Sequence, residues 1–104
     1  MAIYEIIEWE VAPGKMEEVL KLEQPWQAYV RNNGGNVIGG FTTAIGDTSR
    51  LIGLISYEDF GRFGQAAETA QQNPELEKLM QAAGGLVTEI KTSLLLPTPA
   101  SQLQ

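Results

Sequence analysis

Apolar residues alternate with charged ones along Ile3–Val11, and this stretch contains no glycine or proline. Its β-branched and aromatic side chains favour a β-strand. Positions of one parity hold apolar side chains together with Glu5, and positions of the other parity hold Tyr4 and Ile6 together with two glutamates. Both faces are partly apolar, which is typical of a central strand that is covered on both sides.

A helical period follows the turn at Pro13-Gly14-Lys15. Apolar side chains then recur at intervals typical of a helix, namely Met16, Val19, Leu20, Trp26, Tyr29 and Val30. Pro25 removes a backbone donor and clashes with the preceding turn, so we expect a kink or break near Glu23-Gln24. Asn32-Asn33-Gly34-Gly35 should end the helix, since these residues tolerate the left-handed conformation.

Two further strands are predicted at Val37–Ile45 and Leu51–Tyr57, and the short turn between them indicates an antiparallel hairpin. The first contains Gly39-Gly40 and the second contains Gly53. Glycine weakens a strand because it offers no side chain to pack and loses more entropy on ordering. We interpret these glycines as positions in the wall of a barrel where the absence of a side chain leaves room for a ligand. A bulge or a close backbone approach is the alternative.

The second half of the chain predicts more helix and a last strand. Asp59 can cap a helix whose apolar residues are Phe60, Phe63, Ala66, Ala67 and Ala70. Asn73-Pro74 restarts a helical turn with proline at its first position, and Gly84-Gly85 stops it. Leu86–Leu96 is the last strand, and residues 96–104 form an extended tail.

This order predicts an α+β fold of the ferredoxin-like βαββαβ kind, as a single domain over residues 1–104. The antiparallel four-stranded sheet would carry its helices on one face only. The other face would hold Ile, Trp, Leu and Val side chains at outward positions, which a monomer rarely leaves in water. We therefore expect a homodimer in which two sheets pack together as one α+β barrel, with a pocket in each half.

Composition narrows the possible functions. The net charge of −6 and the scattered seven basic residues argue against nucleic acid and anionic membranes as partners. There is no cysteine and no histidine, so we expect no metal site, no haem ligand and no cofactor. Any catalysis must then use Glu, Asp, Tyr, Lys or Arg. The sequence shows neither a signal pattern nor a membrane span, and we expect a cytoplasmic protein.

Four stretches resemble the NIPSNAP family in order and spacing. They are IYEIIEWEVAPGK (3–15), GGFTTAIGDTSRLIGLISYEDF (39–60), NPELEKLM (73–80) and LLLPTPASQLQ (94–104). The resemblance covers nearly the whole chain and implies the dimeric α+β barrel superfamily. That superfamily includes cofactor-independent monooxygenases, polyketide cyclases, isomerases and haem-degrading enzymes.

The chain departs from the family pattern at several sheet positions. Ile7 stands where the family tends to have arginine. Gly40 replaces an aromatic residue, and Ala44 replaces a glutamate. Gly53 and Ile55 stand where the family often has histidine and tryptophan. Polar or bulky groups have thus become small or aliphatic, and we place Gly40, Gly53 and Ile55 among the candidate substrate-binding residues.

Glu5 and Tyr57 are the candidate catalytic residues. An unpaired carboxylate in an apolar cavity would have a raised pKa and could act as a general acid or base. Alternatively, Glu5 pairs with Lys91 or Arg50 or reaches the barrel rim. Tyr57 could donate its hydroxyl to a substrate carbonyl, the role that the resemblance to barrel cyclases implies, or it is a core tyrosine bonded to backbone.

Trp9, Trp26 and Arg50 complete the candidate substrate-binding set. The tryptophans would be walls for a flat ligand or ordinary packing residues. Arg50 would anchor a carboxylate or is a solvated turn residue beside Asp47. The favoured hypothesis is a small, apolar or aromatic ligand in the barrel, and cofactor-independent cyclisation, isomerisation or oxygenation of an aromatic or polyketide-like substrate. The alternative is a non-enzymatic homodimeric binding or scaffold protein.

Overall fold

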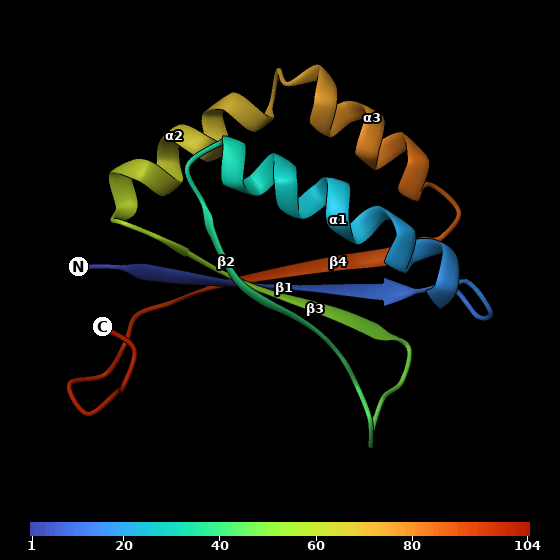
Figure 1. Ribbon diagram of the computed structural model, residues 1–104, viewed down its shortest axis with the longest axis horizontal. Coiled ribbons are helices and arrows are strands. Elements are labelled where there is room, and N and C mark those ends of the chain that lie inside the picture. The colour runs from blue at the N-terminus through green and yellow to red at the C-terminus, as the bar shows by residue number, and fades with distance from the viewer.

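The computed structural model describes residues 1–104 as one antiparallel sheet with helices on one face only (Figure 1). The elements along the chain are β1 (Ile3–Val11), α1 (Met16–Asn32), β2 (Asn36–Thr42), β3 (Arg50–Tyr57), α2 (Phe60–Ala70), α3 (Pro74–Ala83) and β4 (Val87–Leu95). The four strands are ordered β2-β3-β1-β4. This arrangement confirms the predicted ferredoxin-like α+β fold, in which α2 and α3 together take the place of the second helix.

The register of β1 divides the sheet into two faces. Glu5 lies opposite Ile55 of β3 and Leu94 of β4, while Glu8 lies opposite Ile52 and Lys91. Because directly opposed residues share a face, alternate residues of β1 lie on opposite sides of the sheet. The face that carries Glu5 is turned toward the helices and is called the inner face below. The face that carries Glu8 is called the outer face.

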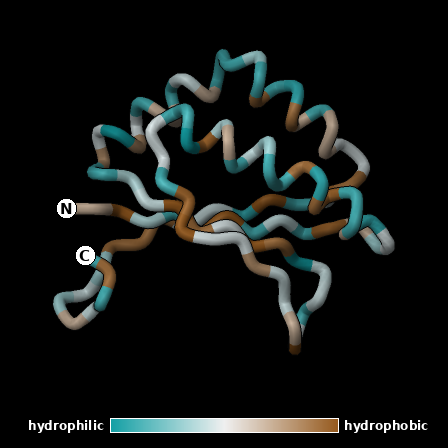
Figure 2. Tube along the Cα trace, in the orientation of Figure 1, coloured by the Kyte–Doolittle hydropathy of each residue, from teal (hydrophilic) through white to brown (hydrophobic).

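The core lies between the inner face and α1. Its buried cluster comprises Ile3, Trp9, Val11, Val19, Trp26, Tyr29, Val30, Leu51, Ile55 and Tyr57. The hydropathy of the trace agrees with this layering, since hydrophobic and hydrophilic segments alternate along the helices (Figure 2). A tryptophan was expected among the outward side chains of the bare sheet face, and Trp9 is the one tryptophan that lies in a strand. That expectation is wrong, because Trp9 is 5% exposed and lies in the core with Trp26.

Of the kink or break expected near Glu23-Gln24, the break does not occur, because α1 continues through Pro25 to Asn32. Pro25 is exposed, whereas the next residues Trp26, Tyr29 and Val30 are buried. Burial of large apolar side chains contributes on the order of 1.5–3 kcal/mol each. That contribution outweighs the backbone hydrogen bond that proline removes, so packing keeps the helix continuous.

Strand β2 is shorter than predicted. It ends at Thr42, so Ala44 and Ile45 lie in the loop before β3, where Ile45 is 95% exposed. The register with β3 shifts between Val37 and Gly39, which marks an irregularity in the strand beside the glycine pair. The apolar character of Ile45 therefore misled the strand prediction, because no partner residue remains to pair with it.

The predicted helix starts at Asp59 and Asn73 are confirmed. The Asp59 side chain accepts a hydrogen bond of 2.8 Å from the Arg62 N–H, and Asn73 accepts one of 2.9 Å from the Glu75 N–H. Both contacts satisfy backbone donors that the first helical turn leaves free. These two caps fix where α2 and α3 begin.

The tail after β4 folds back instead of extending as predicted. Ser101 N–H donates to the Thr98 carbonyl at 3.0 Å, and the Tyr4 hydroxyl donates to the Gln104 carbonyl at 3.2 Å. Tyr4 is consequently only 8% exposed although it lies on the outer face. The tail lies on the side of the sheet away from the helices (Figure 1). No helix of the protein is long and apolar enough to cross a membrane.

Candidate functional site

A cavity of about 220 Å³ lies between the inner face of the sheet and the helices. Strands β1, β3 and β4 supply one side, and α1, α2 and α3 supply the other. Fourteen of its 17 lining residues are hydrophobic, and the remaining three are Glu5, Asn33 and Thr92. Ile90 of β4 and Met80 of α3 line the cavity and are also 44% and 38% exposed, so the cavity reaches solvent beside β4.

Glu5 is the one charged residue that lines this cavity. It is 8% exposed, and none of the ion pairs or side-chain hydrogen bonds of the protein includes its carboxyl group. The pairing alternatives fail for a geometric reason. Lys91 lies opposite Glu8 and Arg50 lies opposite Glu10, so both cations belong to the outer face. Burial without a partner raises the pKa of the Glu5 carboxyl above its ordinary value.

Two tyrosines line the same cavity as Glu5. Tyr57, from the end of β3, makes an edge-to-face contact with Phe63 at 5.3 Å between ring centroids. Burial, followed by the negative charge of Glu5, raises the pKa of Tyr57 to about 12. Its hydroxyl makes no hydrogen bond to the backbone, so the alternative of a backbone-bonded core tyrosine does not describe it.

Tyr29, from α1, is the functional candidate that the sequence reasoning missed. It is 6% exposed, and its hydroxyl is buried without any hydrogen-bond partner in the protein. A buried hydroxyl usually finds a partner, and leaving one unpaired costs about 1–3 kcal/mol. The helical spacing marked Tyr29 only as a core residue. Its phenolic oxygen on an otherwise apolar helix face was the available signal.

Trp9 and Trp26 line the cavity and also pack against each other. Their ring centroids lie 5.3 Å apart with an interplanar angle of 72°, an edge-to-face contact. Ile55 is fully buried between Glu5 and the helices and completes this wall. Five of the predicted site residues thus line one cavity, namely Glu5, Tyr57, Trp9, Trp26 and Ile55. All of them except Glu5 also belong to the hydrophobic core.

Gly40 and Gly53 lie directly opposite each other on the inner face, outside this cavity. A methyl group at Gly53 would lie 3.4 Å from the Trp26 ring. At Gly40 it would collide with the Glu23 carboxylate of α1. The atoms that face these glycines belong to side chains of α1, not to backbone, so the alternative of a close backbone approach does not describe them. The register shift beside Gly39 fits the alternative of a bulge.

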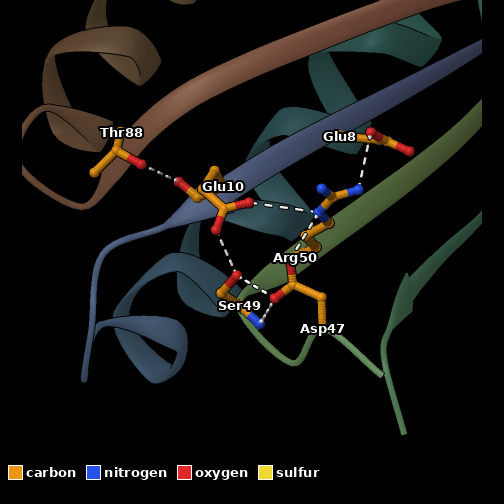
Figure 3. A network of polar contacts seen from close by, with 6 residues as sticks. All are labelled: Glu8, Glu10, Asp47, Ser49, Arg50 and Thr88. Carbon is orange, nitrogen blue, oxygen red and sulfur yellow. Dashed lines mark hydrogen bonds and ion pairs between the residues drawn. The ribbon is translucent and has the colours of Figure 1, made fainter. Parts of the chain in front are cut away.

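Arg50 lies on the outer face within a network of polar contacts (Figure 3). Its guanidinium lies 3.4 Å from Glu8, 3.4 Å from Glu10 and 3.2 Å from Asp47. The Ser49 hydroxyl contacts both Glu10 and Asp47, and hydrogen bonds from Ser49 hold the pKa of Asp47 below its ordinary value. With three carboxylates already around it and the sheet between it and the cavity, Arg50 is a structural cation of the outer face.

The sequence profile of the NIPSNAP family matches residues 4–102. The chain belongs to the NIPSNAP family. A NIPSNAP family protein of Agrobacterium tumefaciens strain C58 is 27% identical, with 100% of both chains covered and a TM-score of 0.88. A NIPSNAP-like domain protein of Burkholderia xenovorans is 24% identical over 96% of this chain and 88% of its own, with a TM-score of 0.84. No curated protein matches the chain.

The same fold extends beyond NIPSNAP proteins. A protein of Nitrosomonas europaea, described as a candidate antibiotic biosynthesis monooxygenase, has a TM-score of 0.72 over 96% of this chain and 93% of its own. At 13% identity this likeness shows the fold alone. The argument for its chemistry must therefore come from the residues of this NIPSNAP chain, namely one unpaired carboxyl and two phenols in a cavity of mainly hydrophobic side chains.

Proposed function

We propose that this NIPSNAP protein binds a small, largely apolar ligand in the cavity between its sheet and its helices. The observation that carries this proposal is Glu5, a buried carboxyl without a partner in a cavity of mainly hydrophobic side chains. Isolated buried charges and unpaired hydroxyls are costly, and the Tyr29 hydroxyl adds a second such group. A ligand with a polar end would satisfy both, and apolar cavities with few polar groups are the usual form of small-molecule sites.

Intrinsic fluorescence tests the proposal. The protein has two tryptophans, and both line the cavity, so a bound ligand should change their emission. We expect saturable changes on titration with 2-phenylethanol, and native mass spectrometry of the purified protein to reveal a bound small molecule. In the variant Ala66→Phe, which fills the cavity from α2, both signals should be lost. The control Ala82→Phe, at an exposed position of α3 outside the cavity, should keep them. A response that survives Ala66→Phe contradicts the proposal.

A second function, proton transfer, is favoured by the raised pKa of Glu5 and its position beside Tyr57. Glu5 would take a proton from carbon next to a ligand carbonyl, and the Tyr57 hydroxyl would donate a hydrogen bond to the resulting enolate oxygen. Cyclisation or isomerisation of an aromatic or polyketide-like substrate would follow from such a step. Oxygenation would begin with the same proton removal, after which the enolate would react with molecular oxygen as co-reactant to give a hydroperoxide.

The probe 2-tetralone tests this second function, because its carbonyl-activated hydrogens exchange with deuterated solvent. We expect the protein to accelerate this exchange, and Glu5→Gln to abolish the acceleration while the circular dichroism spectrum is unchanged. The matched control Glu89→Gln, on β4 and outside the cavity, should exchange like the parent protein. Equal rates for Glu5→Gln and the parent would leave a binding protein without proton chemistry.

We also propose that two copies pack outer face to outer face. Phe41 and Leu95 are 53% and 40% exposed there, and Ile6, Ile52 and Leu54 lie on the same face. An apolar area of this kind on a small chain favours self-association. Sedimentation should give a dimer at micromolar concentration and a monomer for Phe41→Glu. The control Phe60→Glu, at an equally exposed residue of α2, should remain dimeric. A folded monomer of the parent protein would reject the dimer.

A further inference from the structure

We infer that the ligand of this cavity is a small primary amine with an aromatic or aliphatic body, held by its ammonium group at Glu5, Tyr29 and Tyr57. This inference rests on the proposed binding function and adds the chemical class of the ligand. Four observations on the inner face carry it: the sign of the charges, the aromatic lining, the three oxygen atoms and the size of the cavity.

Every charged group at the cavity is negative. Glu5 lines it, and the negative charge of Glu75 contributes to the raised pKa of Tyr29, so Glu75 acts on the same region. No lysine or arginine lines the cavity, and the nearest strand cations, Arg50 and Lys91, lie on the outer face. A buried carboxylate is neutralised either by a proton or by a cation. With a net charge of −6, the protein attracts cations and repels anions.

The lining favours a cation over a proton alone. Five aromatic side chains line the cavity: Trp9, Trp26, Tyr29, Tyr57 and Phe63. Four of them form two edge-to-face pairs, Trp9 with Trp26 and Tyr57 with Phe63, and each such contact covers only one ring face of its pair. Ring faces attract ammonium groups by about 0.5–2 kcal/mol, and aromatic cages are a recurring way to recognise amines. A neutral ligand would gain apolar and aromatic contact from this arrangement but no attraction of a charge to the ring faces.

The polar end matches the donors of a primary ammonium group. Such a group has three N–H donors and no acceptor. Glu5 and the hydroxyl oxygens of Tyr29 and Tyr57 can each accept, and none of them is bonded within the protein. All three groups line the same cavity, and the charges of Glu5 and Tyr29 both contribute to the raised pKa of Tyr57. An ammonium group there would satisfy the Tyr29 hydroxyl, which otherwise has no partner.

The rest of the ligand must be apolar and small. A cavity of about 150 Å³ holds benzene, so the 220 Å³ here accommodates one ring with a short chain. The 14 hydrophobic lining residues leave no site for a second polar group except near Asn33 and Thr92. Asn33 already donates its amide to the Tyr29 carbonyl at 2.8 Å.

Three probes with the same phenylethyl body test the inference: 2-phenylethylamine, 2-phenylethanol and phenylacetate. They differ in charge and polar end, which are positive, neutral and negative. Isothermal titration calorimetry of the full chain at neutral pH should show the amine binding at least about tenfold more tightly than the alcohol, and no binding of phenylacetate. The Tyr29→Phe variant should lose part of the preference for the amine and keep the affinity for the alcohol.

Variants of Glu5 decide the origin of the preference. Glu5→Gln should lose most of the preference for the amine and keep only the part that the ring faces and tyrosine hydroxyls supply, whereas Glu89→Gln should retain the full preference of the parent protein. If the alcohol binds as tightly as the amine to the parent protein, the inference is overturned and the proposed binding function stands. If Glu5→Gln keeps the full amine preference of the parent protein, the inference is likewise overturned, because the preference then does not depend on the Glu5 carboxylate. If none of the three probes binds, the binding function itself is contradicted.

Discussion

Glu5 and Glu8 stand three residues apart on the same strand, yet the two faces of the sheet give them opposite surroundings. Glu8 lies on the outer face, about one third exposed, and contacts the Arg50 guanidinium at 3.4 Å. Glu5 lies on the inner face, buried, with no cation in the cavity. Glu8 therefore has a cation partner within the protein, whereas Glu5 has none. A carboxyl that lies in a cavity without a paired cation is a candidate functional group, whereas paired charges on a surface form a stabilising network.

The largest expected effect compares two isoleucines of β3. Ile55→Ala, at a fully buried inner-face residue, should lower the free energy of unfolding by about 2–5 kcal/mol because it leaves a cavity beside Tyr57. Ile52→Ala, on the half-buried outer face, should cost clearly less within the protomer and should instead weaken the dimer. Urea unfolding at several protein concentrations separates the two effects. Equal losses of unfolding free energy in the two variants would contradict the claim that the inner face carries the core and the outer face the dimer contact.

The second comparison uses pH. Glu5 has a raised pKa in the folded protein, so the folded state holds this proton more tightly than the unfolded state does. The contribution of Glu5 to stability is therefore lost as pH rises from the ordinary value of 4.5 through the raised pKa. The slope is at most about 1.4 kcal/mol per pH unit.

Glu5→Gln should remove this decline and make the protein more stable than the parent at neutral pH. Glu8→Gln should leave the decline in place and change stability by about 0–1 kcal/mol, since its ion pair is partly exposed. Thermal unfolding between pH 4 and pH 8 measures both variants. If the pH profile of Glu5→Gln matches that of the parent, folding does not raise the pKa of Glu5, and the prediction is contradicted.

A smaller effect should appear at alkaline pH. Absorbance titration of the three tyrosines should include one that ionises near pH 12, and this component should vanish in Tyr57→Phe. In Glu5→Gln the midpoint should fall toward 10, because the negative charge that opposes ionisation is gone. Since the pKa of Tyr57 is raised on folding, its contribution to stability is lost as pH rises from 10 through 12. An unchanged midpoint in Glu5→Gln would mean that the charge of Glu5 does not contribute to the pKa of Tyr57.

The smallest effect belongs to the exposed end of the outer-face network. Ser49→Ala removes the hydroxyl that contacts Asp47 and Glu10, so the pKa of Asp47 should move up toward its ordinary value. The backbone N–H of residue 49 still donates to Asp47, which keeps part of the shift. Carbon-detected NMR titration of Asp47 measures the change. No movement would mean that the backbone contact alone sets this pKa.

Local chemistry predicted most of the fold, and tertiary packing decided the rest. The β-branched run from Ile3 and the caps Asp59 and Asn73 depend on neighbours in sequence, and all were predicted. The continuity of α1 through Pro25 depends on burial against the sheet, which no local pattern contains. At the site, alternation on β1 placed Glu5 beside Trp9. The roles of Gly40 and Gly53 could not be predicted, because they depend on which side chains of α1 fill the space above them.

Helix α2 has no buried residue, yet Phe63, Ala66, Ala67 and Ala70 form part of the cavity wall. The wall that shapes the ligand is thus separate from the residues that hold the domain together, which lie on the strands and on α1. Substitutions along α2 can alter the fit of a ligand at little cost to folding. In evolution, such a chain can therefore change its ligand while its fold is kept. A library of variants at these four positions should yield proteins that bind new ligands, and most of its members should still fold.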